Sequence, residues 1–273
     1  MTDNAHQSGK RSDTGFAAAT PPTANVITTD TDGLSTGWID LSVNGQTVPV
    51  YRAQPADKSD LPVILVISEI FGVHEHIADV ARRFAKQGYL ALAPQLFVRQ
   101  GDPSAIADIP TLFRDIVSKA PDAQVNGDLD AVVAWAAQNG GKVDKLGITG
   151  FCWGGRVTWL YSSHNPQVKA GVAWYGRLAG DTNENQTSQP VDIAPTLRVP
   201  VLGLYGAQDT GIPLDTVEAM KAALTQGSSG SEFVVYPDAG HAFYADYRPS
   251  YNARDAQDGW NRALAWFKQH GVA

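Results

Sequence analysis

The stretch that decides the fold is Leu146-Gly-Ile-Thr-Gly-Phe-Cys-Trp-Gly-Gly155, which is followed by a helical run through Ser162. The apolar residues before Gly150 predict a buried strand. Gly150 and Gly154 favour a tight turn, because a Cβ atom at either position would collide with a neighbouring strand or helix. The side chain between them, Cys152, is then expected to stand exposed at the carboxyl edge of a sheet. The stretch therefore predicts a strand, a strained turn and a helix in direct succession.

Short apolar runs alternate with amphipathic stretches from Thr36 onward, which is typical of a parallel sheet flanked by helices. Pro62-Val-Ile-Leu-Val-Ile-Ser68 is continuous and rich in β-branched residues, as expected of a strand covered on both faces. The other expected strands are 89–93, 146–149, 170–175, 199–205 and 233–236, and the expected helices are 76–87, 124–138, 217–224 and 259–270. The fold class is therefore α/β, with a mostly parallel, doubly wound sheet.

Residues 1–35 differ from the rest in composition. They are rich in Thr, Asp, Ala, Ser and Gly without helix or strand periodicity, so they predict a flexible tail or a surface strap that carries no chemistry. Residues 36–273 are expected to form one domain, and the hydrophobic content of 43% is enough for one sizeable core. Neither a secretory signal nor a run of about 18 apolar residues is found, so the expected location is cytoplasmic.

Charge and cysteine usage exclude several functional classes. The net charge is -7 and there is no Lys/Arg run, which argues against nucleic acid or an anionic membrane as the partner and favours a small molecule. The single cysteine excludes an intrachain disulfide and argues against a Cys-based zinc cluster. His74 and His76 lack a third ligand nearby in the sequence, which favours a pair at the start of a helix. No metal and no cofactor are expected.

Two polar residues follow later strands in the order that this architecture requires, with the acid after the nucleophile and the histidine last. Asp209 follows the 199–205 strand, and His241 follows the 233–236 strand. Asp238 is the competing acid, but it lies too close to His241 in sequence to reach round the ring. Because Cys152 also precedes a helix, the positive end of the helix dipole favours its thiolate. The pattern predicts an α/β-hydrolase fold with a Cys-His-Asp triad.

Four segments carry a resemblance to a known family: Ile67-Ser-Glu-Ile-Phe-Gly-Val73, Gly88-Tyr-Leu-Ala-Leu-Ala-Pro94, Gly150-Phe-Cys-Trp-Gly-Gly155 and Gly240-His241. With them the chain resembles the dienelactone hydrolases, or carboxymethylenebutenolidases, over about residues 40–270. Cysteine in place of serine at the turn distinguishes this family from the serine esterases. The resemblance implies an ester or lactone hydrolase whose triad is Cys152, Asp209 and His241.

The resemblance also implies supporting groups around the triad. Glu69 is implied as a further catalytic residue that contacts the thiol and helps to ionise it. The backbone N–H groups of Ile70 and Trp153 are implied as the oxyanion hole, which agrees with the mechanics of the turn. Trp153 and Phe243 adjoin catalytic residues and are candidate substrate contacts, whereas aromatic residues beside such a turn more often serve packing.

The sequence departs from the family at the site for the substrate carboxylate. The family has an arginine a few residues after the catalytic histidine, and Ala245 stands there in this chain. A second family arginine precedes the long helix, and Arg99 and Arg114 are its candidate counterparts. Arg248 is an alternative, although a solvent-facing arginine is the expected interpretation. Dienelactone itself is therefore in doubt as the substrate, and the sequence fixes neither the substrate nor the oligomeric state.

Two stretches are expected to have no part in the chemistry. Asp128 and Asp130 on the 124–138 helix are interpreted as a solvated face, and residues 181–190 as an ordinary polar loop.

The reaction expected from these residues is thiolate attack on an ester or lactone, followed by hydrolysis of a thioester by water that His241 activates. The alternative is a non-hydrolytic protein on the same scaffold that uses Cys152 as a redox or electrophile-sensing thiol. Asp209 and His241 count against this alternative, because a sensor has no use for a general base that activates water.

Overall fold

The protein was analysed as a computed structural model that describes residues 26–273. Its strands form one eight-stranded sheet in the order β1-β2-β4-β3-β5-β6-β7-β8. The pairs β1–β2 and β2–β4 are antiparallel, and all other neighbours are parallel. The strands are β1 (Leu34–Val43), β2 (Gln46–Pro55), β3 (Leu61–Ile67), β4 (Leu90–Pro94), β5 (Gly141–Phe151), β6 (Val168–Trp174), β7 (Val201–Gly206) and β8 (Glu232–Tyr236).

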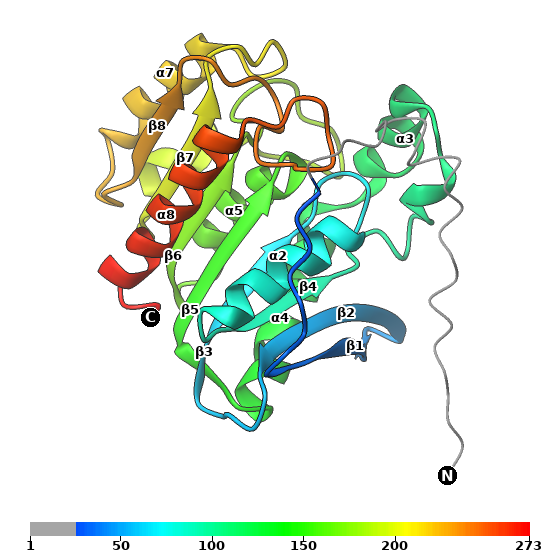
Figure 1. Cartoon of the computed structure of the whole chain (residues 1–273). Helices are drawn as coiled ribbons and strands as arrows, with labels where there is room; N and C mark the ends of the chain where they lie inside the picture. The colour runs from blue at the N-terminus through cyan, green and yellow to red at the C-terminus, as the bar shows by residue number, and fades with distance from the viewer. Residues whose placement is uncertain (1–25) are drawn as a thin grey trace.

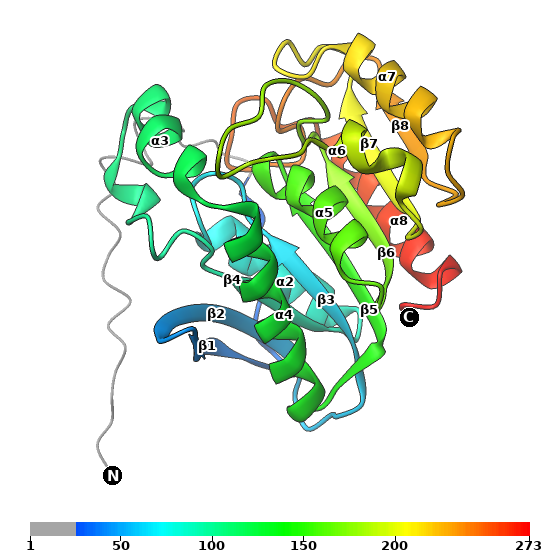
Figure 2. The ribbon, with the colours of Figure 1, turned by 180° about the vertical axis from the view of Figure 1, so that it is seen from behind.

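Helices cover both faces of the sheet. In Figure 1, α2 and α8 lie in front of the sheet, and Figure 2 shows α4 and α5 on the opposite face. The α-helices are α2 (Glu75–Lys86), α3 (Ile109–Asp115), α4 (Asp122–Gln138), α5 (Trp153–His164), α6 (Pro190–Ile193), α7 (Leu214–Leu224) and α8 (Ala253–Gln269). Short 3₁₀ turns are η1 (Pro103–Ala105), η2 (Val117–Lys119) and η3 (Ala194–Thr196). The predicted α/β-hydrolase fold, with its mostly parallel and doubly wound sheet, is confirmed.

The sheet positions the site through its order of strands. β3 has β4 on one side and β5 on the other, so the chain changes direction between β3 and β5. In open α/β sheets, the crevice outside the carboxyl ends of the strands at such a switch point is the usual ligand site. The residues that follow β3 and β5 are Ser68-Glu69 and Cys152. The topology thus brings Glu69 and Cys152 to one edge of the sheet.

Two elements differ from the sequence-based expectation. The β1–β2 hairpin was not predicted strand by strand; it lies at the edge of the sheet, and only part of each strand is buried. Helix α8 begins at Ala253 rather than at 259, because the Asn252 side chain accepts a hydrogen bond from the N–H of Asp255 and caps the helix. Gly259 lies inside this helix, where a Cβ atom would meet the Trp174 ring at 2.6 Å.

Residues 26–33, called the strap here, run along α2. Asp79 accepts a hydrogen bond from the N–H of Thr29 at 2.5 Å, and Arg82 Nε donates to the Thr29 carbonyl at 3.0 Å. The first strand then begins at Leu34, two residues before the predicted domain boundary. The predicted tail therefore includes a surface strap, and its residues 1–25 lie outside the described part of the chain. Within residues 26–273, no helix is long and apolar enough to cross a membrane.

Candidate active site

Cys152 occupies a strained turn between β5 and α5. Its backbone has φ 53° and ψ -114°, and its N–H donates to the Trp174 carbonyl at 3.0 Å. The two glycines are required by contact with backbone atoms. A Cβ atom on Gly150 would lie 2.1 Å from the Gly154 oxygen, and one on Gly154 would lie 2.4 Å from the Ile67 oxygen. The turn thus presents a partly exposed thiol at the N-terminus of α5, as the sequence predicts.

Asp209 and His241 form the pair that the sequence predicts. His241 Nδ1 lies 2.7 Å from Asp209 Oδ2. The other carboxylate oxygen of Asp209 accepts hydrogen bonds from the N–H groups of Gly211 at 2.9 Å and Ile212 at 3.2 Å, so this buried side chain is held in one orientation. The competing acid, Asp238, is exposed and pairs with Arg254 at 3.1 Å. Asp209 is therefore the residue that orients the imidazole.

His241 carries a strongly perturbed pKa. Burial disfavours the charged ring, but the negative charge of the Cys152 sulfur and the hydrogen bond with Asp209 outweigh it and raise the pKa of His241 to about 10. An imidazolium beside a thiolate is the arrangement that a cysteine nucleophile needs at neutral pH.

Glu69 is buried beside the catalytic cavity and is held by three neighbours. The Tyr247 hydroxyl donates to its Oε2, His74 Nε2 lies 3.7 Å from the same oxygen, and Arg248 Nη1 lies 3.9 Å from Oε1. Burial raises the pKa of this carboxyl, but the nearby His74 ring and the charge of Arg248 outweigh burial and lower it to about 2. Within residues 26–273, no hydrogen bond joins the carboxylate to the Cys152 thiol.

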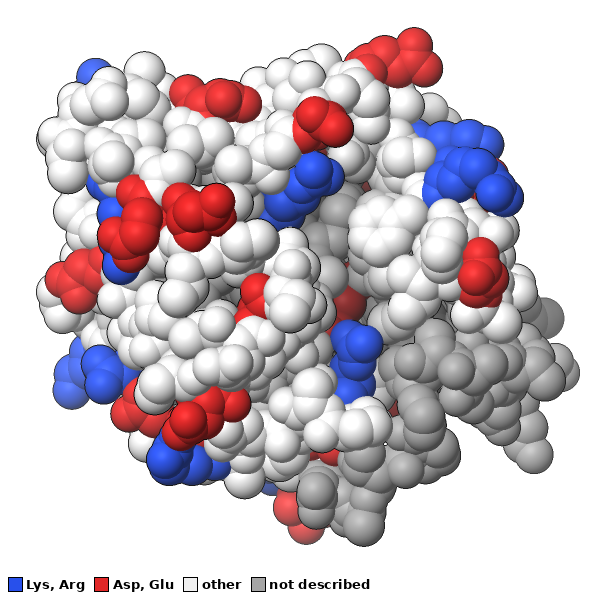
Figure 3. Space-filling model, turned by 90° about the horizontal axis from the view of Figure 1, so that it is seen from above, with Lys and Arg blue, Asp and Glu red and all other residues white. Residues whose placement is uncertain are grey.

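A cavity of about 780 Å³ lies over these residues. Figure 3 looks down on this end of the molecule, where the surface is hollowed and both acidic and basic side chains are visible around the hollow. Both residues expected to form the oxyanion hole, Ile70 and Trp153, line the cavity. The lining also includes Glu69, Phe71, Ile109, Phe113, Cys152, Arg156, Tyr175, Arg177, Gln208, Asp209, His241 and Arg248. The structure therefore brings the four predicted catalytic residues to one cavity.

Three of the predicted pocket residues lie elsewhere. Phe243 is fully buried in the core, where its ring packs against Trp174 and Tyr175. Its side chain is on the core side of the loop and does not line the cavity.

The arginines expected before the long helix are used in ion pairs outside the cavity. Arg99 binds both carboxylate oxygens of Asp128, at 2.6 and 2.9 Å. Asp128 is 1% exposed, so its interpretation as part of a solvated face was wrong. Arg114 is exposed on α3 and pairs with Asp115 at 2.8 Å. Neither arginine lines the cavity, so neither takes the place of the family arginine there.

Several lining residues were missed by sequence reasoning. The interpretation of Arg248 as solvent-facing was wrong, since it lines the cavity beside Glu69, whereas Ala245 is fully buried. The loop 181–190 was interpreted as an ordinary polar loop, yet part of it forms one wall: Asp181, Thr182, Asn183 and Gln186. No local pattern marks these residues, because only the folded chain brings them over Cys152.

Tyr175 directly follows β6 and lines the cavity. Its backbone has φ 39°, a conformation that costs a non-glycine residue about 1–3 kcal/mol. Its hydroxyl is buried and has no hydrogen-bond partner among the described residues. Burial and the nearby negative charges of Glu69 and Cys152 raise its pKa well above the usual value, so the hydroxyl keeps its proton.

The two histidines at the start of α2 each face a carboxylate. Their rings stack 6.0 Å apart, and His76 Nδ1 lies 3.0 Å from Asp246 Oδ1, while His74 faces Glu69. In residues 26–273, no group of three or more His, Cys, Asp or Glu side chains is arranged to hold a metal ion.

The chain is similar to known proteins in both sequence and structure. The sequence profile of the dienelactone hydrolase family matches residues 48–271. The chain is 56% identical over 259 residues to the "Putative carboxymethylenebutenolidase" of Escherichia coli (strain K12), which covers 94% of this chain and 96% of that protein. It is 57% identical over 264 residues to the protein of the same name from Methylorubrum extorquens, with 95% and 90% covered.

A solved structure gives the same result. The crystal structure of the "Putative Dienelactone Hydrolase" from Klebsiella pneumoniae is similar with a TM-score of 0.84 and 57% identity, covering 86% of this chain and 99% of that one. The family profile covers the strands and loops that carry Cys152, Asp209 and His241. The chain belongs to the dienelactone hydrolase family and is a carboxymethylenebutenolidase-like carboxylic ester hydrolase.

Proposed function

We propose that this protein hydrolyses a small carboxylic ester or lactone through a Cys152-His241-Asp209 triad and a thioester intermediate. The observation that carries the proposal is the position of Cys152. It lies on a strained turn at a helix N-terminus and lines the same cavity as His241. The Nδ1 atom of His241 lies 2.7 Å from Asp209 Oδ2. No step requires a cofactor.

In the proposed reaction, His241 accepts a proton in each of the two half-reactions. Transfer of the thiol proton to His241 leaves a thiolate, which attacks the carbonyl carbon and forms the C–S bond. The tetrahedral intermediate then expels the alcohol or enol oxygen, which takes the proton from His241. Neutral His241 next removes a proton from water; the hydroxide attacks the thioester, and the C–S bond breaks as the thiolate leaves. Asp209 keeps the ring in the tautomer that each transfer needs.

The backbone N–H groups of Ile70 and Trp153 are proposed to bind the carbonyl oxygen as it becomes negative. Both residues line the cavity, one after β3 and the other directly after Cys152. Each such donor, aimed at the developing charge, contributes about 10²–10³ to the rate of acyl transfer. A cysteine nucleophile requires a substrate with a good leaving group, because the tetrahedral intermediate can also expel the thiolate and return to the substrate. Activated esters and enol lactones should therefore react better than amides.

The arginines of the cavity favour a substrate that carries a carboxylate. Arg156 is already bound by Asp122 at 2.7 Å and by Gln189, so its charge is compensated. Arg248 faces Glu69 only at 3.9 Å, and Arg177 bonds to the carbonyl of its own loop. These two guanidinium groups keep donors for an anion. We propose that Arg248, in place of the absent family arginine at Ala245, contacts the substrate carboxylate.

The decisive experiment combines kinetics with labelling of the single thiol. Purified protein is mixed with 4-nitrophenyl acetate, and nitrophenol release is followed through the first equivalent and beyond it. A burst followed by steady turnover, lost after stoichiometric alkylation of Cys152 by iodoacetamide, is the expected result. A burst of one equivalent without turnover would instead identify a reactive thiol that does not hydrolyse its thioester. Full activity after complete labelling, verified by mass spectrometry, would exclude Cys152 as the nucleophile.

A further inference from the structure

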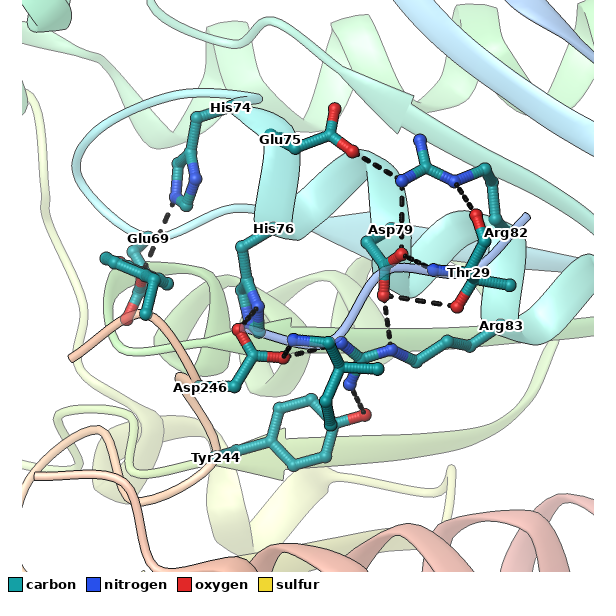
Figure 4. Close-up of polar contacts among 12 residues, drawn as sticks. Thr29, Glu69, His74, Glu75, His76, Asp79, Arg82, Arg83, Tyr244 and Asp246 are labelled. Carbon is teal, nitrogen blue, oxygen red and sulfur yellow. Dashed lines mark hydrogen bonds and ion pairs between the residues drawn. The ribbon is translucent and has the colours of Figure 1, made fainter. Parts of the chain in front are cut away.

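A network of buried charges lies near Glu69, among residues that do not line the cavity. Figure 4 shows it between the strap, helix α2 and the loop of residues 237–252, which joins β8 to α8 and carries His241. Two aspartates form its centres. Asp79 on α2 and Asp246 in the loop are both 1% exposed, and Arg83 bridges them, with Nε 2.5 Å from Asp79 and Nη2 2.6 Å from Asp246.

Asp246 connects the loop to two other parts of the fold. It accepts hydrogen bonds from Arg83 and from the N–H of Ile27 in the strap, and its Oδ1 lies 3.0 Å from His76 Nδ1. Arg83 also donates from Nη1 to the Tyr244 hydroxyl at 3.2 Å. Tyr244 and Asp246 therefore both hold the loop against α2.

The next two residues after Asp246 are those that hold Glu69. The Tyr247 hydroxyl donates to one carboxylate oxygen, and Arg248 approaches the other at 3.9 Å. Asp246 does not line the cavity. Because residues 246–248 are consecutive, the backbone that presents both contacts to Glu69 is fixed at its first residue by the contacts of Asp246. A shift of this backbone moves both partners of Glu69 together.

We propose that Asp246 is a positioning residue of the active site, which acts through Tyr247 and Arg248 to fix the Glu69 carboxylate beside Cys152. The inference rests on the proposed function and adds to it the means by which Glu69 is oriented. It also gives the strap a role, because the strap donates to both aspartates. A displacement of about 1 Å in a group near the reacting atoms can cost about 10²-fold in rate.

The chain offers a matched control for this role. Asp79 is equally buried and binds the same Arg83, but its other partners are Thr29 and Arg82, in the strap and on α2. Among the described residues it makes no hydrogen bond to the loop 237–252. Asp79→Asn and Asp246→Asn therefore both weaken the network, and only the second removes a carboxylate that ties the loop to α2.

The experiment is a double-mutant cycle with Glu69→Gln, measured on 4-nitrophenyl acetate at a temperature at which circular dichroism shows every variant folded. We expect Asp246→Asn to lower kcat/KM by about tenfold to a hundredfold in the native background. In the Glu69→Gln background, the same substitution should lower it by less than about twofold, because its target is already lost. Asp79→Asn should have the same small effect in both backgrounds.

Arg83→Gln provides a second route to the same loop if Asp246→Asn does not fold. Its loss of kcat/KM should likewise be large with Glu69 and small in the Glu69→Gln background. Arg82→Gln is the control, because Arg82 contacts the strap, α2 and Tyr51, and its effect should be the same in both backgrounds. Equal losses from Asp246→Asn with and without Glu69 would overturn the inference and leave a structural role only. Failure of the proposed function would be seen separately, as hydrolysis that is unchanged after complete alkylation of Cys152.

Discussion

The Asp209 carboxylate bonds to His241 through one oxygen and to two backbone N–H groups through the other. The acid of the site is therefore fixed before any substrate binds, and the imidazole ring is oriented by a rigid partner. His241 itself remains partly exposed toward the cavity. This arrangement leaves its second nitrogen available for Cys152 and for water.

Asp209→Asn should lower kcat by roughly 10²–10⁴ without unfolding the protein, because an amide in this position favours the wrong tautomer of His241. Asp238→Asn is the control, since Asp238 is exposed and pairs only with Arg254 at the surface. Steady-state kinetics of the two variants on one ester tests the choice of acid. A larger loss from Asp238→Asn would show that the choice is wrong.

The pKa of His241 gives a prediction that NMR can test. It is raised from 6.5 to about 10 despite burial, chiefly by the charge of Cys152 and by the hydrogen bond with Asp209. A raised histidine pKa means that the protonated ring stabilises the native state below pH 6.5, and that this contribution is lost as the pH rises toward 10. Cys152→Ala removes the largest favourable cause. The imidazole signals of the variant should therefore titrate at a clearly lower pH than those of the native protein.

The negative charge of Glu69 should affect turnover and labelling in different ways. A carboxylate in the same cavity as the thiol disfavours a resting thiolate, because two negative charges repel each other. Glu69→Gln is therefore expected to lower ester turnover while iodoacetamide labels Cys152 equally fast or faster. Since the pKa of Glu69 is about 2, the contrast should persist across the neutral range. Loss of both turnover and labelling would show instead that Glu69 promotes the thiolate.

Two Gly→Ala substitutions, one beside the turn at Cys152 and one on α4, should have opposite effects on stability. In Gly154→Ala the new Cβ atom meets the Ile67 and Ser68 carbonyl oxygens at 2.4 and 2.6 Å, and backbone cannot move aside cheaply. The free energy of unfolding should fall by about 1–3 kcal/mol or more. Gly127→Ala on α4 meets nothing within 4 Å and should raise it by up to about 1 kcal/mol. Urea denaturation of both variants measures the difference.

The sequence by itself determined the fold class and the candidate nucleophile, acid and base. Each of these depends on local chemistry: a β-branched run predicts a buried strand, two glycines around Cys152 predict a tight turn, and residues after parallel strands must meet at one edge. The candidate acid and base, Asp209 and His241, could be placed for this reason. Their separation of 2.7 Å agrees with that placement.

Only the tertiary structure decided how the cavity is walled and how Glu69 is held. Arg248 and the loop 181–190 reach the cavity from segments with no distinguishing local pattern, while Arg99 is taken up by Asp128 on another helix. The strap likewise contacts Asp246, 219 residues away in sequence. Such contacts depend on the shapes and charges of surfaces that meet only after the sheet has formed, and periodicity within one segment carries no information about them.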